Sequence, residues 1–183
     1  GDDHHGARPH EGINAIEVGY AIFQQLQQIH IAPDIPSSIK MTRFQAGSEA
    51  VNVIPGSATF SLDIRAQTND ALNQIKERIK QVMETFMKLY DIKIEFTFID
   101  EVPAAVINEE AENVLFEAIV DNLGTEHAKR KVVTAGSDDF HFYTLLRPNI
   151  KATMLALGAD VVPGLHAPNM TFNKAALNNG VKI

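Results

Sequence analysis

The chain has 183 residues, 45% of them apolar, which is enough for a substantial core and excludes wholesale disorder. A net charge of -7 without any Lys/Arg run argues against a nucleic-acid surface, and no apolar run approaches the length that spans a bilayer. Because there is no cysteine, a disulfide scaffold, a thiolate zinc site and a cysteine nucleophile are all excluded. We therefore expect a cytoplasmic protein that binds neither nucleic acid nor a membrane.

The first helical pattern runs over residues 13–31 and ends before Pro33. Its predicted inner face is an apolar stripe, made of Ile13, Ile16, Tyr20, Phe23, Leu26 and Ile29. Strands are predicted over 39–47, from Ile39-Lys40-Met41-Thr42, and over 58–65, where apolar and polar residues alternate strictly.

A second helix is expected to start at a cap formed by Asn69 or Asp70. One face of this helix is apolar and consists of Leu72, Ile75, Ile79, Val82, Phe86 and Leu89. Ile92, Ile94, Phe96 and Phe98 then predict another strand.

If residues 1–5 end a first strand, the element order becomes β-α-β-β-α-β. This order predicts an α+β, ferredoxin-like sandwich, with a four-stranded antiparallel sheet and both helices on one face. The opposite face of the sheet would carry polar side chains, namely Thr59, Ser61, Asp63 and Arg65.

Residues 100–108 read as a linker, after which Asn108 can cap a helix that ends at Gly124. Short strands are expected at 131–133 and 152–157, followed by a loop that holds His166 and a helix within 172–181. These strands have few obvious partners. We therefore interpret the last eighty residues as a piece of a larger α/β sheet.

The first ten residues contain three histidines, His4, His5 and His10, together with two aspartates. Imidazole and carboxylate groups can bind zinc, but this spacing matches no compact zinc finger. Exposed loop histidines are the alternative interpretation.

Asn52 lies between two predicted strands, and Arg65 is the last residue of the predicted strand 58–65. An amide and a guanidinium can together bind a carbonyl and a carboxylate, although a turn asparagine and a surface arginine would look the same. Ser137, Asp138 and His141 do not have the spacing of a nucleophilic triad, and no complete catalytic set is visible.

Four short blocks stand out in order along the chain: Gly1-x-x-x-His5 with Ala7-Arg8-Pro9-His10, Asn52-Val53-Ile54-Pro55 with Asp63-Ile64-Arg65, Gly136-Ser137-Asp138-Asp139-Phe140, and Gly164-Leu165-His166-x-Pro168. In this order they resemble the dinuclear-zinc aminoacylase/carboxypeptidase family of metal-dependent amidohydrolases, and the third block resembles its hippurate hydrolase branch. The resemblance implies that residues 1–104 are a lid, or dimerisation, domain and residues 105–183 are the C-terminal segment of the α/β catalytic domain. The N-terminal catalytic half, with most metal ligands and the general base, would be absent here.

The resemblance also implies roles for individual residues. His166 would be a metal ligand, His5 would stabilise the oxyanion in the partner subunit's active site, and Asn52 and Arg65 would hold the substrate's carbonyl and carboxylate. Asp138 stands where the hippurate hydrolase branch usually has Glu, and the roles of His4 and His10 stay open.

The full-length parent is therefore expected to be a homodimer, joined through the lid, that hydrolyses N-acyl amino acids or small peptide-like amides. It would use two divalent metal ions, Zn or else Mn or Co. This chain alone, with one expected ligand, should be inactive and bind none tightly. The alternative is a noncatalytic dimerisation or small-molecule-binding module.

Overall fold

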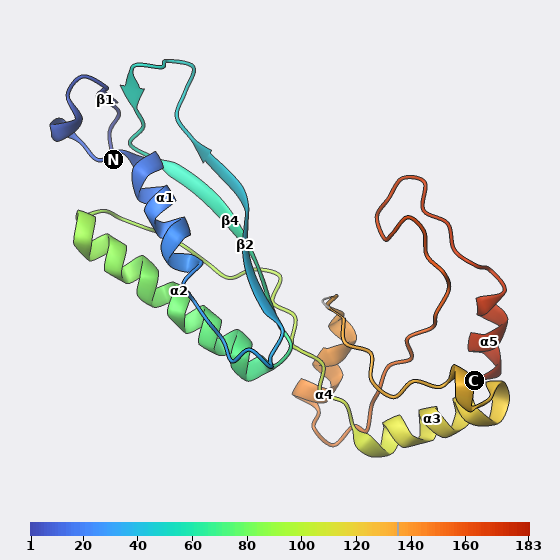
Figure 1. Ribbon diagram of the computed structural model, residues 1–183. Coiled ribbons are helices and arrows are strands. Elements are labelled where there is room, and N and C mark those ends of the chain that lie inside the picture. Colours follow the sequence, from blue (N-terminus) through green and yellow to red (C-terminus); the bar gives the residue numbers. More distant parts are fainter. Residues whose placement is uncertain (135) are drawn as a thin grey trace. The chain divides into compact units, whose positions relative to one another are not determined.

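The computed structural model describes residues 1–134 and 136–183, and the chain divides into two compact units, Gly1–Ala104 and Ala105–Ile183 (Figure 1). Unit 1 contains β1 (His4–His5), η1 (Pro9–Glu11), α1 (Ala15–Leu26), β2 (Ser37–Ala46), β3 (Val53–Ile54), β4 (Ala58–Ala66) and α2 (Asn69–Tyr90). Unit 2 contains α3 (Glu109–Leu123), η2 (Thr125–His127), η3 (Asp139–His141), α4 (Phe142–Leu146) and α5 (Ala176–Lys182).

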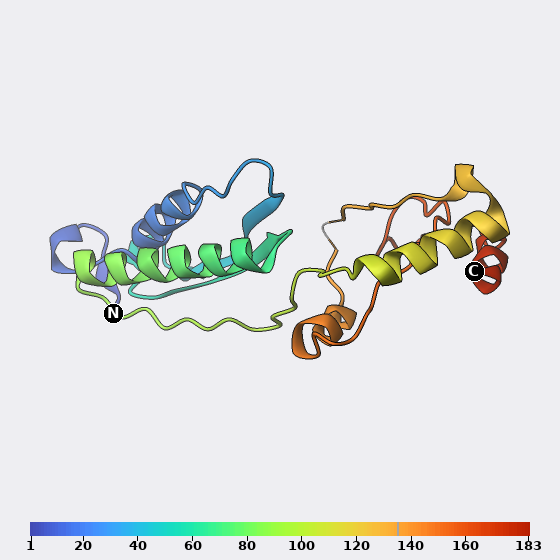
Figure 2. The ribbon, with the colours of Figure 1, turned by 90° about the horizontal axis from the view of Figure 1, so that it is seen from below.

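The core of unit 1 lies between α1, α2 and the antiparallel β2–β4 ribbon (Figures 1 and 2). Phe60, Leu62 and Ile64 of β4 pack against this core, so the residues that alternate with them belong to the outer face. On that face Lys40 stands opposite Asp63 and Ser38 stands opposite Arg65. The predicted alternation of β4 is therefore confirmed.

The α2 helix buries nearly the face that its periodicity predicts, through Ala71, Ile75, Ile79, Met83 and Phe86. Its cap, however, is Thr68, whose hydroxyl accepts the Ala71 N–H at 3.1 Å, and not Asn69 or Asp70. The Asn69 amide instead holds the segment after α2, because its oxygen accepts the Ala104 N–H at 2.8 Å.

The inner face predicted for α1 is only partly correct, because Leu26 is buried but Ile16 and Tyr20 are not. The residues that α1 buries are Val18, Gly19, Ile22 and Leu26, whereas Ile16 and Tyr20 of the predicted stripe are 44% and 60% exposed. Both stripes have helical spacing, so periodicity alone could not choose between them. As a result, α1 has apolar residues on its outer side as well as on its inner side.

The predicted four-stranded sheet is not confirmed, because the described residues form two separate two-stranded sheets, β1–β3 and β2–β4. Residues 92–98 are not a strand, although Ile92, Ile94 and Phe98 still pack against the core. Apolar alternation thus located three partly buried side chains correctly but failed at Phe96, which is 43% exposed. It could not supply the backbone partner that a strand requires.

In unit 2, Asn108 caps α3 as predicted, with its side-chain oxygen accepting the Ala111 N–H at 3.0 Å, and Gly124 ends the helix at φ +96°. The predicted strands 131–133 and 152–157 are not strands in the structure. Within the described part of unit 2, strand-like pairing occurs only at the Val162–Thr171 bridge.

Unit 2 buries few apolar side chains. Among its described residues, Ala176 alone belongs to the buried hydrophobic set, and α3 has no buried residue. Over residues 1–134 and 136–183, no helix is both long enough and apolar enough to cross a bilayer.

Candidate functional site

The β1–β3 pair brings two of the predicted site residues together. His5 stands opposite Val53, and the Gly6 N–H donates to the Asn52 carbonyl oxygen at 2.7 Å. Both His5 and Asn52 are exposed. An imidazole and a carboxamide that are far apart in the sequence thus lie on neighbouring segments of one small sheet.

The His5 ring has a defined hydrogen-bonding state. Its Nδ1 accepts the Ala7 N–H at 3.1 Å, so a neutral ring carries its proton on Nε2. Because His5 is exposed, this Nε2–H is available to an oxygen of another molecule. A fixed N–H donor of this kind can stabilise a negatively charged oxygen as it forms.

The segment that carries Asn52 is tied to unit 1 at two further points. An oxygen of the Asp3 carboxylate accepts the Gly56 N–H at 2.8 Å, and the Pro55 carbonyl accepts the N–H of Ala15, the first residue of α1, at 2.9 Å. Sequence reasoning considered Asp3 only as one of several possible zinc-binding groups and assigned no role to Gly56. Their contact joins segments distant in the sequence, and no short motif signals it.

Arg65 lies away from His5 and Asn52. It is seven residues beyond Ala58, the start of β4, which corresponds to roughly 23 Å along a strand. Its Nε donates to both Asp63 carboxylate oxygens, at 3.0 and 3.2 Å. This hydrogen bond, followed by the attraction of the opposite charge, raises the pKa of Arg65 above its ordinary value, against a small opposing effect of burial.

His166 lies exposed in a loop of unit 2 that the Val162–Thr171 bridge closes, with backbone N–H to O distances of 3.0 and 2.8 Å. Its backbone has φ +67°, a left-handed conformation that residues other than glycine adopt infrequently. The loop therefore holds this imidazole at the surface.

The described residues do not fit a metal site by themselves. No group of three His, Asp or Glu side chains in residues 1–134 and 136–183 is arranged to hold a metal ion. A tightly held zinc ion takes three or four protein ligands, and His166 can supply one.

The residues whose roles were left open now have local explanations. Asp138 caps η3, with its carboxylate accepting the Phe140 N–H at 2.9 Å. His10 is exposed within η1, and the half-buried His4 ring lies against Gly12. None of these contacts gives Asp138, His4 or His10 a direct chemical role.

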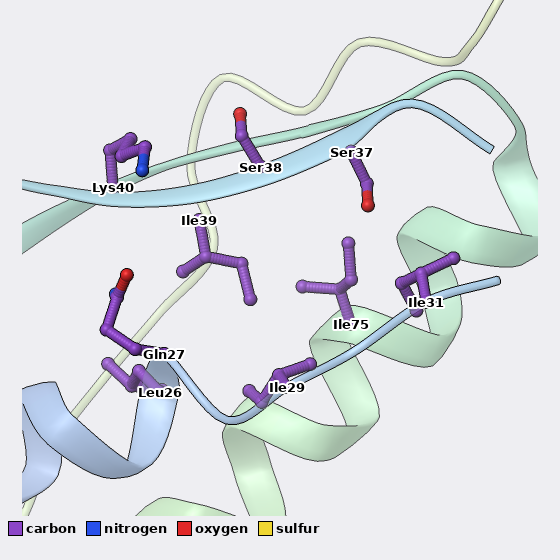
Figure 3. A pocket seen from close by; sticks show the side chains of 9 residues that line it. All are labelled: Leu26, Gln27, Ile29, Ile31, Ser37, Ser38, Ile39, Lys40 and Ile75. Atoms are coloured by element: carbon purple, nitrogen blue, oxygen red, sulfur yellow. The ribbon is translucent and has the colours of Figure 1, made fainter. Parts of the chain in front are cut away.

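A hollow of about 180 Å³ lies beside the first residues of β2 (Figure 3). Its lining comes from β2, from the end of α1 and the loop after it, and from α2: Leu26, Gln27, Ile29, Ile31, Ser37, Ser38, Ile39, Lys40 and Ile75. Figure 3 shows Ile39 and Ile75 pointing toward the same space. None of the predicted site residues lines it, so we interpret it as an open edge of the core.

Comparison with known proteins places the chain in a family. The sequence pattern of the peptidase dimerisation domain matches residues 1–91, which make up most of unit 1. Residues 1–91 belong to the peptidase dimerisation domain family, and relatives of the chain are named as a hydrolase and a deacetylase, which confirms the family predicted from the four sequence blocks.

Curated relatives match both units. An N-acetyldiaminopimelate deacetylase of Lactiplantibacillus plantarum is 28% identical over 184 residues, which cover 99% of this chain and 47% of the relative. A hydrolase of Sinorhizobium fredii is 27% identical over 176 residues, covering 94% of this chain and 44% of the relative. The chain therefore spans about half the length of the curated relatives it matches.

Solved structures share the fold. A candidate aminohydrolase of methicillin-resistant Staphylococcus aureus has a TM-score of 0.79 at 22% identity, covering 100% of this chain and 48% of that one. The aminopeptidase PepT of Bacillus cereus has a TM-score of 0.75 at 16% identity, covering 99% of this chain and 46% of its own. The mixed α+β class predicted from the sequence is thereby confirmed.

Proposed function

We propose that the complete protein is a metal-dependent amidohydrolase that cleaves N-acyl amino acids or small peptide-like amides. Residues 1–104 would form its lid and dimerisation domain, and residues 105–183 would form the C-terminal segment of its catalytic domain. Support comes from the hydrolase family of the chain and from the relative named as a deacetylase of N-acetyldiaminopimelate, which is an N-acylated amino acid.

The observation that carries this proposal is the His5–Asn52 pair. The His5 Nε2–H is a donor suited to the oxyanion that forms when an amide carbonyl is attacked, and the Asn52 amide can hold the same carbonyl before attack. In this assignment both residues act directly on the substrate. The His5 ring is oriented within unit 1 by its bond from the Ala7 N–H.

Arg65 would bind the free carboxylate of the substrate, because a guanidinium matches a carboxylate with two parallel hydrogen bonds. About 23 Å of strand separates Arg65 from the start of β4, which is too far for one small substrate to bridge within a single copy. His5 and Asn52 from one copy and Arg65 from another could share one substrate. A homodimer therefore suits the site.

The outer side of α1 is our proposed dimer surface. Ile16 and Tyr20 are exposed there, Ile13 is exposed just before the helix, and Gly19 brings the helix close to the ring of Phe44 on β2. Among the described strands, β2 pairs with β4 alone, so its other edge has unpaired backbone groups. An apolar helix side beside an open strand edge suits a second copy of the same surface.

A charge at Tyr20 tests this surface. Tyr20→Glu should convert the dimer to a monomer in analytical ultracentrifugation, because two carboxylates would be buried at a two-fold contact. Leu89→Glu is the matched control, because Leu89 is also exposed, at 68%, but lies on α2. If Tyr20→Glu stays dimeric and Leu89→Glu dissociates, the interface does not lie on the outer side of α1.

His166 would supply one ligand to a pair of divalent ions, zinc or else manganese or cobalt, which polarise the scissile carbonyl and activate water when bound. The remaining ligands would come from parts of the complete protein outside this chain. The isolated chain would then be inactive and would hold no metal tightly. A noncatalytic dimerisation module is the second candidate, favoured by the match of residues 1–91 to a peptidase dimerisation domain.

The assignment of His5 is tested by kcat of the complete protein on an N-acyl amino acid. His5→Ala should lower kcat by about 100-fold with little change in KM, as expected for a donor used mainly in the transition state. His127→Ala, which removes an exposed imidazole in η2, is the control and should leave kcat unchanged. A normal kcat in His5→Ala would contradict the proposed role.

A further inference from the structure

We infer that Gly12 and His4 are positioning residues for His5. This inference rests on the proposed function, in which His5 is a donor to the reacting oxygen. No catalytic contact is assigned to Gly12 or His4 themselves. Their role is to fix the rotation of the short strand β1, and hence the direction of the His5 ring.

Gly12 leaves the space that the His4 ring occupies. A Cβ built on Gly12 would lie 1.8 Å from Cδ2 and 2.3 Å from Nε2 of His4. The backbone at Gly12 is extended, with φ -159° and ψ 177°, a conformation open to any residue. A side chain at this position would therefore displace the His4 ring, whereas the backbone itself would tolerate it.

Successive side chains of a strand point to opposite faces. Because His4 and His5 are the two residues of β1, seating His4 against Gly12 directs His5 to the other face. With only two residues paired to β3, the ladder itself gives β1 little rigidity. The strand therefore depends on contacts at its sides and ends.

Two further contacts hold β1 along its length. The Asp3 carboxylate accepts the Gly56 N–H at 2.8 Å just before β1, and the Gly6 N–H donates to Asn52 at 2.7 Å just after it. These two bonds fix the position of β1 beside β3. The contact between the His4 ring and Gly12 also restricts the rotation of β1 about its own axis, which neither hydrogen bond does.

Gly12→Ala is the direct test, measured as kcat and KM of the complete protein. The added methyl group should displace the His4 ring and lower kcat by about tenfold, with KM nearly unchanged, because misplacing a catalytic group by a fraction of an ångström already costs rate. Gly158→Ala is the matched control. A Cβ at Gly158 meets no atom within 4 Å, so kcat should be unchanged.

A double-mutant cycle separates positioning from a general loss of fold. His4→Ala alone should lower kcat by a similar factor, and Gly12→Ala added to His4→Ala should cost nothing more, because the methyl group then fills vacated space. Likewise, Gly12→Ala added to His5→Ala should have no further effect. If the two substitutions of either pair lower kcat by the product of their separate factors, the inference is overturned.

The outcomes also distinguish this inference from the proposed function. If His5→Ala has normal kcat, the proposed function of His5 is wrong. If His5→Ala is slow but both Gly12→Ala and His4→Ala retain normal kcat, the positioning inference alone is wrong. Should Gly12→Ala fold poorly, His4→Ala decides the question, because it removes the ring without adding any atom.

Discussion

Ile75 of α2 should be among the side chains on which the fold of unit 1 depends most. It is 1% exposed and packs in the cluster formed by α1, α2 and β2. Ile75→Ala removes three carbon atoms, which is worth about 2.4 kcal/mol of apolar transfer. A residual cavity adds to this cost, but Ile75 also lines the open hollow of Figure 3, whose walls can partly collapse.

We therefore expect Ile75→Ala to lower the free energy of unfolding of unit 1 by about 3 kcal/mol. Hydrogen exchange with mass spectrometry on the α1 and α2 peptides measures this in the full chain. Exchange of the most protected amides should accelerate by roughly 150-fold. Leu89→Ala, at an exposed position of the same helix, should change exchange by less than about threefold. Equal effects of the two variants would refute the core assigned to α2.

Arg65→Ala should raise KM by roughly 10- to 100-fold for substrates with a free carboxylate, and leave KM unchanged for their carboxamide analogues. Asp63 raises the pKa of Arg65, so the guanidinium stays charged at pH values well above neutral. Titration of Arg65 should therefore cause no change in KM in steady-state assays from about pH 6 to about pH 9. Asn108→Ala should destabilise α3 by about 1 kcal/mol through loss of its cap, seen as faster amide exchange over 109–123, whereas Asn122→Ala should not. An unchanged KM in Arg65→Ala, or an Asn122 effect as large as that of Asn108, would contradict these assignments.

The sequence predicted best what local chemistry decides. The α2 helix is long and strongly periodic, so its buried face could be identified, and Asn108 and Gly124 mark the ends of α3 through cap interactions made within the helix itself. The inner face of α1 could not be chosen, because Ile16 and Tyr20 lie on a second apolar stripe. That failure is informative, since an apolar outer side on a surface helix is typical of an interface.

Strand pairing and the support of the site depend on contacts between distant segments. Residues 92–98 have the alternation of a strand, but alternation gives no information about a backbone partner. Two of the four sequence blocks contain His5 and Asn52, and the β1–β3 register is what brings them together. The His4 ring lies where a side chain at residue 12 would be, and no sequence pattern signals this contact.

We propose that this chain is part of a metal-dependent amidohydrolase. The decisive experiment is hydrolysis of a panel of N-acetyl and N-benzoyl amino acids by the complete protein, with and without a chelator. We predict cleavage of at least one substrate, loss of cleavage after chelation, and recovery when zinc, manganese or cobalt is added back. A protein that binds no divalent metal and cleaves no member of the panel would contradict the claim and favour the noncatalytic dimerisation module.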